Sequence, residues 1–467
     1  MTRLHEIITV PRPIDEVFRY TSNFANIEQW DPGVSESEKL TAGAVGEGSE
    51  FRVVVTSGLS STPMIYRVTR FEPPNSVVLE GSGGPVHAID EISFTAVKEG
   101  TRIEYTADIT LSGLGGLFQP LMGGILDKVG KKALAGLKSA LSTEPPVPAE
   151  STVRNLADRL ILPGALAFTR FGYARKKKTW KPLAVSMQGQ TAIVTGATSG
   201  LGRVTAERLA ELGASVVLVG RNREKLEQAT AEIADASGTS GVRFEVADLS
   251  LMSEVRSLAR RLLNRETEIQ VLINNAAVLP LERSVTSEGL ETAFATDLLS
   301  PFLLTRLLLP RLQKSAPSRI VNVLSGGMYM SGINLQDLQN SEGEYDGSRA
   351  YARAKRGLMI LTELWAEALE PSGVAVNAMH PGWADTPGVQ TSLPGFHKVT
   401  RAVLRSPEEG ADTIVWLAAA PEAGRVSGKF WLDREPHLSE IIPGTAGSES
   451  DRKKLVQKLE KIAKSVE

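Results

Sequence analysis

A glycine-punctuated turn between an apolar strand and a helix constrains the fold of this chain more than any other stretch. The sequence Thr-Gly-Ala-Thr-Ser-Gly-Leu-Gly occupies residues 195–202 and follows the apolar run Thr191–Val194. Glycines at 196, 200 and 202 allow a tight turn and a close approach of the backbone to a ligand. The N–H groups and the dipole at the start of the next helix favour an anion there, typically a pyrophosphate. The stretch predicts a strand–turn–helix unit that binds a nucleotide cofactor.

From residue 188 onward, short apolar runs alternate with amphipathic segments. This alternation is typical of a doubly wound parallel sheet with helices on both faces. The predicted strands are 191–194, 215–219, 242–246, 271–274, 319–324, 374–379 and 428–432, and the predicted helices include 201–212, 223–236, 251–264, 289–313 and 351–370. We predict an α/β fold, a Rossmann-type doubly wound parallel sheet over residues 188–443, and a charged tail helix within residues 444–467.

Residues 1–142 predict a separate α+β domain. Strand-like runs recur at 4–10, 51–55, 64–71, 77–80, 88–94 and 102–111. A first helix is expected to begin at Pro11–Pro13, and a long helical pattern covers residues 117–141. Strands followed by one long closing helix indicate a curved antiparallel sheet that grips this helix.

The segment of residues 143–187 breaks the overall neutrality of the chain. It begins with a proline-rich linker at 143–150 and continues with an apolar helical stripe over 153–161. No acid occurs between residues 159 and 190, and the basic residues there are Arg159, Arg170, Arg175, Lys176, Lys177, Lys178 and Lys181. The interleaved aromatic residues are Phe168, Phe171, Tyr173 and Trp180. Two interpretations stay open: the segment packs on a domain, or residues 153–181 make a peripheral membrane contact.

Composition excludes several classes of chemistry. The chain has 467 residues, no cysteine and five histidines. Thiol nucleophiles and cysteine-ligated zinc are therefore excluded, and no group of histidines and acids has the spacing of a metal site. A formal net charge of −2 gives no general attraction to nucleic acid. Without a signal-peptide pattern or an uninterrupted spanning apolar run, we expect a cytoplasmic location, with membrane association only through residues 153–181.

Tyr351 and Lys355 stand four residues apart on a predicted helix, so the phenol and the ammonium share one face. A tyrosine ionises at a pKa of about 10, and a neighbouring Lys⁺ and an oxidised nicotinamide ring are both expected to favour the phenolate and lower that pKa. Such a phenol takes a proton from an alcohol or returns one to a carbonyl. Ser325 ends the strand at 319–324, where its hydroxyl can hydrogen-bond a substrate oxygen. The three residues predict a site for alcohol–carbonyl interconversion.

These motifs resemble the short-chain dehydrogenase/reductase family over about residues 188–443. The resemblance implies an NAD(P)-dependent enzyme with Ser325, Tyr351, Lys355 and the residue at 297 in its active site. It implies that Asp248 and Leu249 flank the adenine, that Asn275 and Ala276 flank its ribose, that Lys355 also binds the nicotinamide ribose, and that Thr386 binds the carboxamide or a phosphate. The full implied cofactor-binding set is Thr195, Gly196, Ser199, Gly200, Leu201, Gly202, Arg221, Asn222, Asp248, Leu249, Asn275, Ala276, Lys355, Pro381, Gly382 and Thr386.

Three features qualify the resemblance. The interval from Ser325 to Tyr351 is 26 residues, and its extra segment resembles the retinol-dehydrogenase-like branch. Asp297 stands where the family carries an asparagine that helps to hold a proton-relay water, which puts the relay in question more than the hydride transfer. His380 precedes Pro-Gly and is expected to be a structural histidine with its hydrogen bonds satisfied.

The end of the second predicted strand indicates which dinucleotide is bound. NAD-binding enzymes usually place an acid there for the ribose 2′-hydroxyl. This chain has Gly220 in that place, followed by Arg221. Because a carboxylate is missing and a guanidinium is available for a 2′-phosphate, the sequence predicts NADP (NADPH), with NAD less favoured.

Residues 1–142 resemble the START-like (SRPBCC, polyketide cyclase/dehydrase) superfamily. The resemblance rests on Pro13 with Val17-Phe18, on Trp30–Val34 and on Gly46–Gly48. It implies an apolar cavity between sheet and helix. Candidates to line that cavity are His87, Asp90, Glu91 and Tyr105, each of which is better explained as a solvated or core group, and Trp30 is better explained as a core residue.

The sequence as a whole predicts an NADP-dependent oxidoreductase that acts on an apolar small molecule, lipid-, retinoid- or steroid-like, with a fused apolar-ligand-binding domain. Two alternatives stay open. One is a non-catalytic, lipid-binding and cofactor-sensing protein, suggested by Asp297. The other is a bifunctional polyketide cyclase-reductase in which the first domain is also an enzyme. The number of subunits and the substrate stay open.

Overall fold

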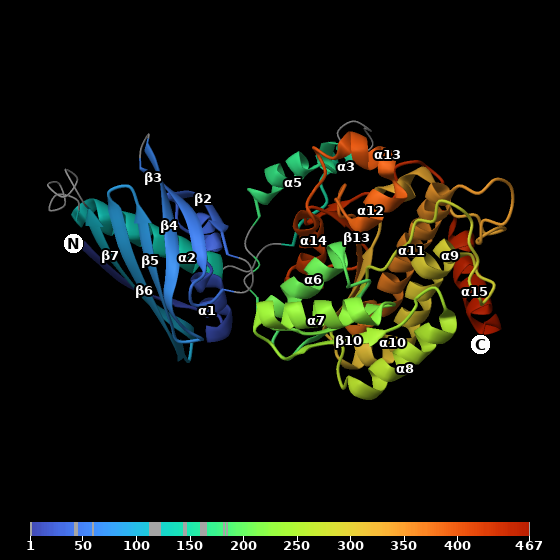
Figure 1. The fold of residues 1–467 in the computed structure, drawn as a ribbon, viewed down its shortest axis with the longest axis horizontal. Helices are drawn as coiled ribbons and strands as arrows, with labels where there is room; N and C mark the ends of the chain where they lie inside the picture. Colours follow the sequence, from blue (N-terminus) through green and yellow to red (C-terminus); the bar gives the residue numbers. More distant parts are fainter. Residues whose placement is uncertain are drawn as a thin grey trace. The chain divides into compact units, whose positions relative to one another are not determined.

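The computed structural model describes residues 2–41, 45–57, 60–111, 123–142, 147–158, 166–180, 183 and 185–466. The chain forms two compact units, one of residues 1–145 with 181–186 and one of residues 146–180 with 187–467 (Figure 1). Residues 117–122 of the predicted closing helix and residues 159–161 of the predicted apolar stripe lie outside the described residues, as do Arg159 and Lys181.

The first unit is a curled antiparallel sheet of seven strands in the order β1-β7-β6-β5-β4-β3-β2 (Figure 1). The strands are β1 (Thr2–Val10), β2 (Val34–Lys39), β3 (Glu50–Ser57), β4 (Ser60–Glu72), β5 (Ser76–Gly83), β6 (Val86–Val97) and β7 (Gly100–Leu111). Helices α1 (Ile14–Ser22) and η1 (Phe24–Gln29) join β1 to β2, and α2 (Gly123–Ser142) follows β7. Alternation along β7 buries Ile103 and Ala107 in the same core as Leu137 of α2. The predicted antiparallel sheet with a closing helix is confirmed.

The second unit is a doubly wound sheet in the order β10-β9-β8-β11-β12-β13-β14-β15. The strands are β8 (Thr191–Thr195), β9 (Ser215–Gly220), β10 (Val242–Val246), β11 (Val271–Asn274), β12 (Ser318–Val323), β13 (Val374–Met379), β14 (Phe430–Leu432) and β15 (Glu435–His437). Every neighbouring pair is parallel except β14 with β15. The chain runs outward from β8 to β10 and returns to β11 on the other side of β8. The carboxyl ends of β8 and β11 therefore flank the switch point at which such sheets bind ligands.

Two layers of helices cover this sheet (Figure 1). One layer holds α6 (Gly200–Glu211), which contacts both α7 (Arg223–Ser237) and α14 (Pro407–Ala419). The other layer holds α10 (Ser300–Lys314), which contacts both α8 (Met252–Arg265) and α11 (Gly347–Leu369). Leu258, Leu308 and Leu358 from the second layer are fully buried in one apolar core with the sheet. The predicted Rossmann-type α/β architecture is confirmed.

The predicted helix 289–313 is one run with a local irregularity. It consists of α9 (Thr292–Phe294), the π-helical turn η3 (Ala295–Leu299) and α10. In the described part of the chain, this run from Thr292 to Lys314 is the one helix long and apolar enough to cross a membrane by length and composition. Because 78% of its apolar window is buried inside the unit, it has the character of a core helix.

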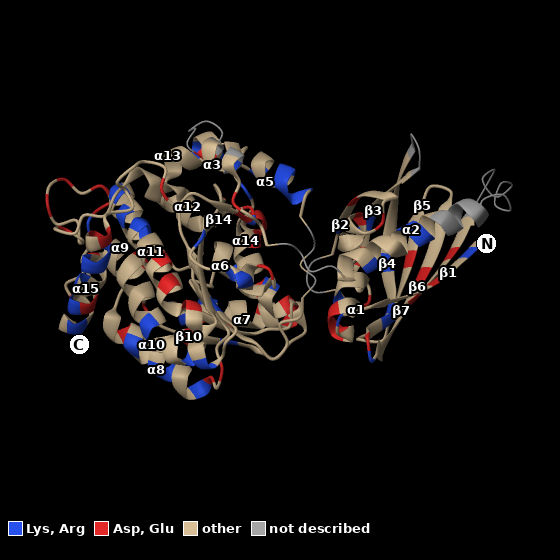
Figure 2. Ribbon diagram, turned by 180° about the vertical axis from the view of Figure 1, so that it is seen from behind, with Lys and Arg blue, Asp and Glu red and all other residues tan. Residues whose placement is uncertain are grey.

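The predicted tail helix is α15 (Glu449–Ser465), and it docks on α11. Leu455, Leu459 and Ala463 form its buried stripe, while its outer face carries charges of both signs (Figure 2). Ion pairs tie α15 to its neighbours, among them Arg306 with Glu460 at 2.9 Å. The tail is thus part of the second unit.

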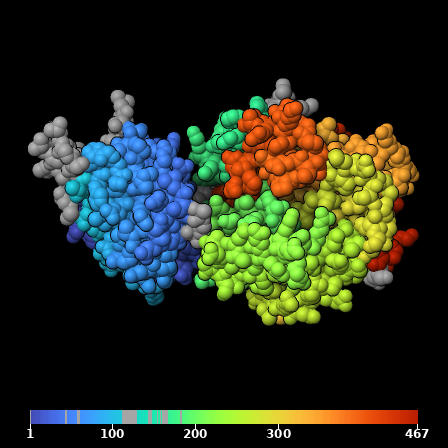
Figure 3. Space-filling view, in the orientation of Figure 1, coloured from blue at the N-terminus to red at the C-terminus, as the bar shows by residue number. Residues whose placement is uncertain are grey.

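The described parts of the lead-in segment, residues 147–158 and 166–180, pack on the rest of the second unit. Its helix α3 (Thr152–Asp158) is held by Asp158, which contacts His437 Nδ1 at 2.7 Å. Its helix α5 (Arg170–Lys177) is held at one end by the backbone bond from Arg170 N to Val403 O, at 2.9 Å. Val403 belongs to the α12–α13 segment, residues 386–405, which contains α12 (Pro387–Ser392) and α13 (Pro394–Thr400). The two segments adjoin on one face of the second unit (Figure 3).

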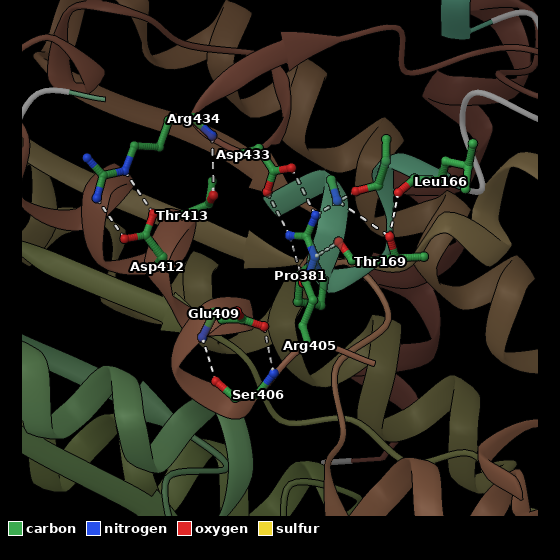
Figure 4. A network of polar contacts seen from close by, with 12 residues as sticks. Leu166, Thr169, Pro381, Arg405, Ser406, Glu409, Asp412, Thr413, Asp433 and Arg434 are labelled. Atoms are coloured by element: carbon green, nitrogen blue, oxygen red, sulfur yellow. Dashed lines mark hydrogen bonds and ion pairs between the residues drawn. The ribbon is translucent and has the colours of Figure 1, made fainter. Parts of the chain in front are cut away.

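A buried arginine joins the lead-in segment to the sheet. Arg405 is 1% exposed and forms a two-pronged ion pair with Asp433, at 2.6 and 2.9 Å (Figure 4). The same guanidinium donates to the carbonyls of Ala167 (2.6 Å) and Thr169 (3.3 Å). A Cβ on Gly382 would lie 2.3 Å from Arg405 Nε, so only glycine fits there. Through these contacts, residues 166–180 pack on a domain, as the first of the two interpretations of this segment predicts.

Candidate active site

The glycine turn folds against the end of β11. Thr195 Oγ1 accepts hydrogen bonds from the backbone N–H groups of Asn275 (2.9 Å) and Ala276 (3.1 Å). The Asn275 side chain donates to Thr195 O at 2.8 Å. A Cβ on Gly202 would lie 2.3 Å from Gly196 O, and Gly196 has a φ of +66°. Backbone packing therefore requires glycine at 196 and 202, and the Asn275 side chain holds the turn together.

Gly200 and its neighbours form the part of the turn that fits an anion. Gly200 has a φ of +54°, and a Cβ there would lie 3.4 Å from Thr386 Cγ2, so the lack of a side chain leaves a cradle between the two. Ser199 precedes α6 but makes no side-chain cap. The first N–H groups of α6 are therefore uncapped by Ser199 and suit a pyrophosphate. Leu201 points to α14, because a Cβ on Gly410 would lie 2.7 Å from its Cδ2.

The ends of β9 and β10 carry the residues predicted to bind the adenosine part. Arg221 follows β9 and is exposed, and no described side chain pairs with it. The Asn222 side chain caps α7 by accepting from Lys225 N at 2.8 Å. Asp248 Oδ1 accepts from Ser250 N (2.9 Å) in a local turn, and Leu249 is buried in the core. Asn222 and Asp248 are thus positioned by backbone contacts of their own.

Ser325, Tyr351 and Lys355 meet at the carboxyl end of β12. Ser325 Oγ accepts from Gly327 N at 3.3 Å, and the serine is hydrogen-bonded to Tyr351. Lys355 Nζ donates to Val323 O (3.0 Å) and lies 5.5 Å from the centre of the Tyr351 ring. Helix α11 begins four residues earlier than predicted, because Asp346 caps it by accepting from Arg349 N.

Burial controls the ionisation of the tyrosine and the lysine. Burial raises the pKa of Tyr351, the charge of Asp297 raises it further, and the hydrogen bond with Ser325 lowers it. Burial lowers the pKa of Lys355, and the charge of Asp297 raises it. The protein's own groups therefore shift the Tyr351 pKa upward, because desolvation and the Asp297 charge outweigh the hydrogen bond with Ser325; the downward shift that the sequence predicts also counts on an oxidised nicotinamide ring.

Asp297 is fully buried in the π-helical turn η3. Its Oδ1 accepts from Val278 N at 2.9 Å, and its Oδ2 has no hydrogen-bond partner among the described residues. Burial raises the pKa of Asp297 to about 7, while the charge of Lys355 and the bond from Val278 lower it and Glu291 raises it. The aspartate makes a contact that an asparagine oxygen would also make, and it adds a charge that changes near neutral pH.

His380 lies directly beside this site, which the sequence did not indicate. The ring is buried, its centre 4.5 Å from that of Phe168, and a Cβ on Gly326 would lie 3.1 Å from its Nε2. Neither ring nitrogen has a hydrogen-bond partner within the described ranges. The prediction that the hydrogen bonds of His380 are satisfied is therefore wrong. Burial, with the charges of Arg405 and His437, lowers the pKa of His380 to about 3, and the ring is neutral at pH 7.

Several of the most exposed large apolar side chains lie in segments that follow the strands of this sheet. Six described residues are 64–85% exposed, and the next is 49% exposed; the six are Leu156, Leu166, Phe171, Leu281, Met330 and Val399. Leu281, Met330 and Val399 lie in segments that follow the carboxyl ends of β11, β12 and β13. The other three belong to the lead-in segment. Exposed apolar side chains mark an interaction surface or a binding cleft where they lie together.

In the first unit, the four candidate cavity residues separate into two groups. His87 and Glu91 are exposed and contact Glu80 (2.8 Å) and Arg70 (2.5 Å). Asp90 and Tyr105 are buried, and the Tyr105 hydroxyl donates to Asp90 Oδ1 at 2.8 Å. Burial raises the pKa of Asp90 to about 7, with hydrogen bonds from Tyr105 and Tyr66 acting in the opposite direction. Trp30 is buried in the core, as expected.

The switch point of the sheet suits a dinucleotide, and the side chains at this edge suit the interconversion of an alcohol and a carbonyl. The second unit is an NAD(P)-dependent oxidoreductase. Residues 190–395 match the family described as short chain dehydrogenase, and residues 1–142 match the family described as polyketide cyclase / dehydrase and lipid transport. A Bos taurus protein, dehydrogenase/reductase SDR family member 12, is 40% identical over 305 residues, which cover 64% of this chain and 95% of that protein. The chain belongs to the short-chain dehydrogenase/reductase family.

The chain is also similar to a retinol dehydrogenase and to a solved structure. Retinol dehydrogenase 14 of Mus musculus is 38% identical over 291 residues, which cover 58% of this chain and 84% of that protein. Among solved structures, an uncharacterized protein from Mycobacterium Paratuberculosis has a TM-score of 0.49 and 27% identity, covering 60% of this chain and 95% of that chain.

Proposed function

We propose that the second unit uses NADPH to interconvert an alcohol and a carbonyl on an apolar small molecule, and that the first unit holds an apolar ligand. The observation that carries the proposal is the meeting of Ser325, Tyr351 and Lys355 at the carboxyl end of β12. This edge also carries the glycine turn, so a dinucleotide held there and these three side chains can face the same substrate.

The proposed mechanism divides the work among the three side chains. A nicotinamide cofactor, when bound at the glycine turn, would provide the hydride chemistry. The Tyr351 hydroxyl gives its proton to the carbonyl oxygen in reduction and recovers it from the alcohol in oxidation. Its high pKa in this structure suits the protonated form that reduction needs. Ser325 hydrogen-bonds the substrate oxygen, and Lys355, fixed by Val323 O, stabilises negative charge on the phenol.

Asp297→Asn is expected to change the pH profile of alcohol oxidation. Oxidation needs the Tyr351 phenolate, and the Asp297 charge that forms as pH rises through about 7 raises the pKa of Tyr351. Removing that charge should let the phenolate form at lower pH and increase kcat/KM for oxidation at pH 8 by up to about tenfold, the effect of one pKa unit. The measurement is kcat/KM against pH with saturating NADP.

Asp346→Asn is the matched control for this profile. Asp346 is an exposed carboxylate at the start of the helix that carries Tyr351, and asparagine caps a helix equally well. Its profile should match that of the unchanged protein. An Asp297→Asn variant that loses activity at every pH would contradict the electrostatic role and give Asp297 a direct part in proton transfer.

Arg221→Ala is expected to abolish a preference for NADPH. A guanidinium on the 2′-phosphate is a charge-assisted contact of about 1.5–3 kcal/mol, so NADPH should bind about 10–100-fold more weakly while NADH binding stays similar. Nucleotide fluorescence titration measures both. Arg223→Ala is the control, because Arg223 is a neighbouring exposed cation paired with Glu227. Equal affinity of the unchanged protein for NADPH and NADH would refute the assignment.

An apolar substrate is supported by the exposed apolar residues Leu281, Met330 and Val399 in the segments around the site. The mouse relative is named for retinol, so all-trans-retinal is a reasonable first probe. NADPH consumption with retinal, a steroid ketone and a sugar ketone tests the proposal. Turnover of the two apolar compounds and not of the sugar is the expected result, and the reverse preference would overturn it.

The alternative of a second catalytic activity in the first unit gains support from Asp90 and Tyr105. Their hydrogen bond holds a buried carboxyl beside a phenol, and the raised pKa of Asp90 keeps a proton available near neutral pH. Such a pair can hydrogen-bond a carbonyl or hydroxyl of an apolar ligand, or donate a proton to it. Ligand recognition needs only the hydrogen bond to the ligand. The cyclase-reductase alternative needs both the hydrogen bond and the proton donation.

A further inference from the structure

The lead-in segment and the α12–α13 segment together form a surface with an unusual charge pattern. Neither residues 166–180 nor residues 386–405 contain an aspartate or a glutamate. The cations on this surface that are exposed and have no side-chain partner within the described ranges are Arg170, Arg175, Lys177, Lys178, Lys398 and Arg401. Lys176 is excluded, because it pairs with Glu435 at 2.5 Å. We call the two segments together the α5–α13 surface.

Nearby acids are already engaged by other groups. Glu435 contacts Lys176 and also Arg154, at 3.0 Å. Asp385, directly before the second segment, contacts His397 at 3.1 Å and accepts from Gln390 at 2.8 Å. The positive charge of the α5–α13 surface is therefore not compensated by these carboxylates.

Three large apolar side chains stand among these cations. Leu166, Phe171 and Val399 are 68%, 65% and 85% exposed. Their exposure is not a sign of a loose segment, because aromatic residues anchor both helices from beneath. The Tyr173 and Trp180 rings lie 5.2 Å apart, with Arg434 4.4 Å over Trp180. The rings of Trp383 and Phe396 lie 5.3 Å apart under α13.

The two segments lie side by side and do not merely share a composition. The backbone bond from Arg170 to Val403 joins the start of α5 to the chain that follows α13, and Trp383 N donates to Phe168 O at 2.8 Å. Figure 3 shows the two segments adjoining on one face, and Figure 2 shows the cluster of basic residues at the end of α5. Apolar and basic side chains thus occupy one continuous surface.

We propose that the α5–α13 surface binds an anionic lipid bilayer, with Leu166, Phe171 and Val399 entering the headgroup region and the cations contacting the lipid phosphates and carboxylates. Charge complementarity selects this occupant, because an uncompensated basic face with protruding apolar side chains needs a partner that is anionic outside and apolar inside. The aromatic residues Phe168, Tyr173 and Trp180, which the sequence offered as membrane contacts, serve instead as the anchors beneath the surface.

The position of the surface connects bilayer binding to the supply of an apolar substrate, and this connection rests on the proposed function. Val399 lies in the segment that follows β13, at the same edge of the sheet as Ser325. An apolar substrate dissolved in the bilayer would therefore reach the site without crossing bulk water. Lipid binding itself does not depend on catalysis, and the two properties can be tested apart.

Vesicle flotation of the full chain tests the surface. Vesicles of phosphatidylcholine with about one third phosphatidylserine should carry the protein at low salt, and phosphatidylcholine alone should not. Raising the salt from about 50 mM to about 500 mM should weaken binding, because exposed charges are screened. Changing Arg170, Arg175, Lys177 and Lys178 together to glutamine should reduce the partition coefficient at least about 100-fold, since each engaged cation contributes roughly fivefold.

A control variant of equal charge change distinguishes this surface from general electrostatics. Lys225, Lys314, Lys454 and Lys461 are exposed cations on α7, α10 and α15, and their joint change to glutamine should alter binding by less than about threefold. Equal losses in the two variants, or no flotation of the unchanged chain at low salt, would overturn the proposal. A double variant Phe171→Ser, Val399→Ser should also bind more weakly. If it binds unchanged, the surface recognises polyanions without inserting, and the bilayer proposal fails.

The same variants separate this proposal from the proposed function. The quadruple glutamine variant on α5 should keep its turnover of retinal presented in detergent, because none of its changed residues lies in the candidate active site. Loss of turnover by Tyr351→Phe with flotation intact would leave the surface standing on its own. Flotation failing in a fully active enzyme would refute the surface alone.

Discussion

Tyr351→Phe is expected to lower kcat by about 10²–10⁴-fold and to leave NADPH binding nearly unchanged. The substitution removes the one hydroxyl that we assign to proton transfer, and a positioned acid or base contributes a factor of that size. The ring and its neighbour Lys355 stay in place, because Lys355 is held by Val323 O and not by the phenol. Single-turnover oxidation of NADPH with a reactive ketone measures the chemical step, and nucleotide fluorescence measures binding.

Two companion variants define what this loss means. Tyr173→Phe removes a phenol outside the candidate site and keeps the ring that lies against Arg405, so it should retain turnover. Lys355→Met should reduce turnover and NADPH affinity together, because the lysine is assigned both to the phenol and to the ribose. A Tyr351→Phe variant with near-normal kcat would remove the acid–base assignment.

Arg405→Met is expected to destabilise the second unit by about 3–5 kcal/mol, the cost of leaving one partner of a buried ion pair alone. Asp433 would keep a buried carboxylate without its guanidinium, and the carbonyls of Ala167 and Thr169 would lose their donor. Guanidinium unfolding followed by near-UV circular dichroism measures the loss. Trypsin should also cut faster at Arg175–Lys178, because the lead-in segment would be held less firmly.

Arg306→Met is the matched control for that measurement. Arg306 pairs with Glu460 at 2.9 Å, but both side chains are well exposed, so the loss should be at most about 1 kcal/mol. The double variant Arg405→Met, Asp433→Leu should cost less than Arg405→Met alone, because no unpaired charge is left. An Arg405→Met variant as stable as Arg306→Met would show that the buried pair contributes little.

The sequence predicts the second unit well because its central strands are buried on both faces and are mostly continuous apolar runs. The predicted strands 271–274 and 374–379, for example, coincide with β11 and β13, which are buried along nearly their whole length. The glycine turn can be predicted from the sequence for a related reason. Glycines 196 and 202 meet backbone atoms at distances that no side chain tolerates, so the residue type reports the geometry directly.

The strands that the sequence did not indicate are those with little to bury. Strand β2 (Val34–Lys39) lies at the edge of the first sheet, and Val34 is its one fully buried side chain. Strand β15 (Glu435–His437) is three residues long and also lies at an edge. Neither produces the alternation of apolar and polar residues on which strand prediction depends.

Features that depend on contacts between residues far apart in the sequence could not be predicted, for a different reason. The upward shift in the pKa of Tyr351 comes from burial and from Asp297, 54 positions earlier, and a pattern of residue types carries neither distance nor depth. The π-helical turn around Asp297 reads as ordinary helix. The role of Phe168, Tyr173 and Trp180 as packing residues required the position of Arg405 and Arg434, which follow them by more than two hundred residues.

The docking of the lead-in segment by Arg405 sets an order of events during synthesis. Arg405 follows Thr169, whose carbonyl it binds, by 236 positions. At translation rates of about 5–20 residues per second, roughly 12–47 s pass between the two. For that interval the nascent chain carries Phe168, Tyr173 and Trp180 without the surface that buries them. The first segment of the second unit to leave the ribosome is therefore among the last to reach its final place, and a chain arrested before Arg405 would present these aromatic residues, flanked by lysines, to whatever stands nearby.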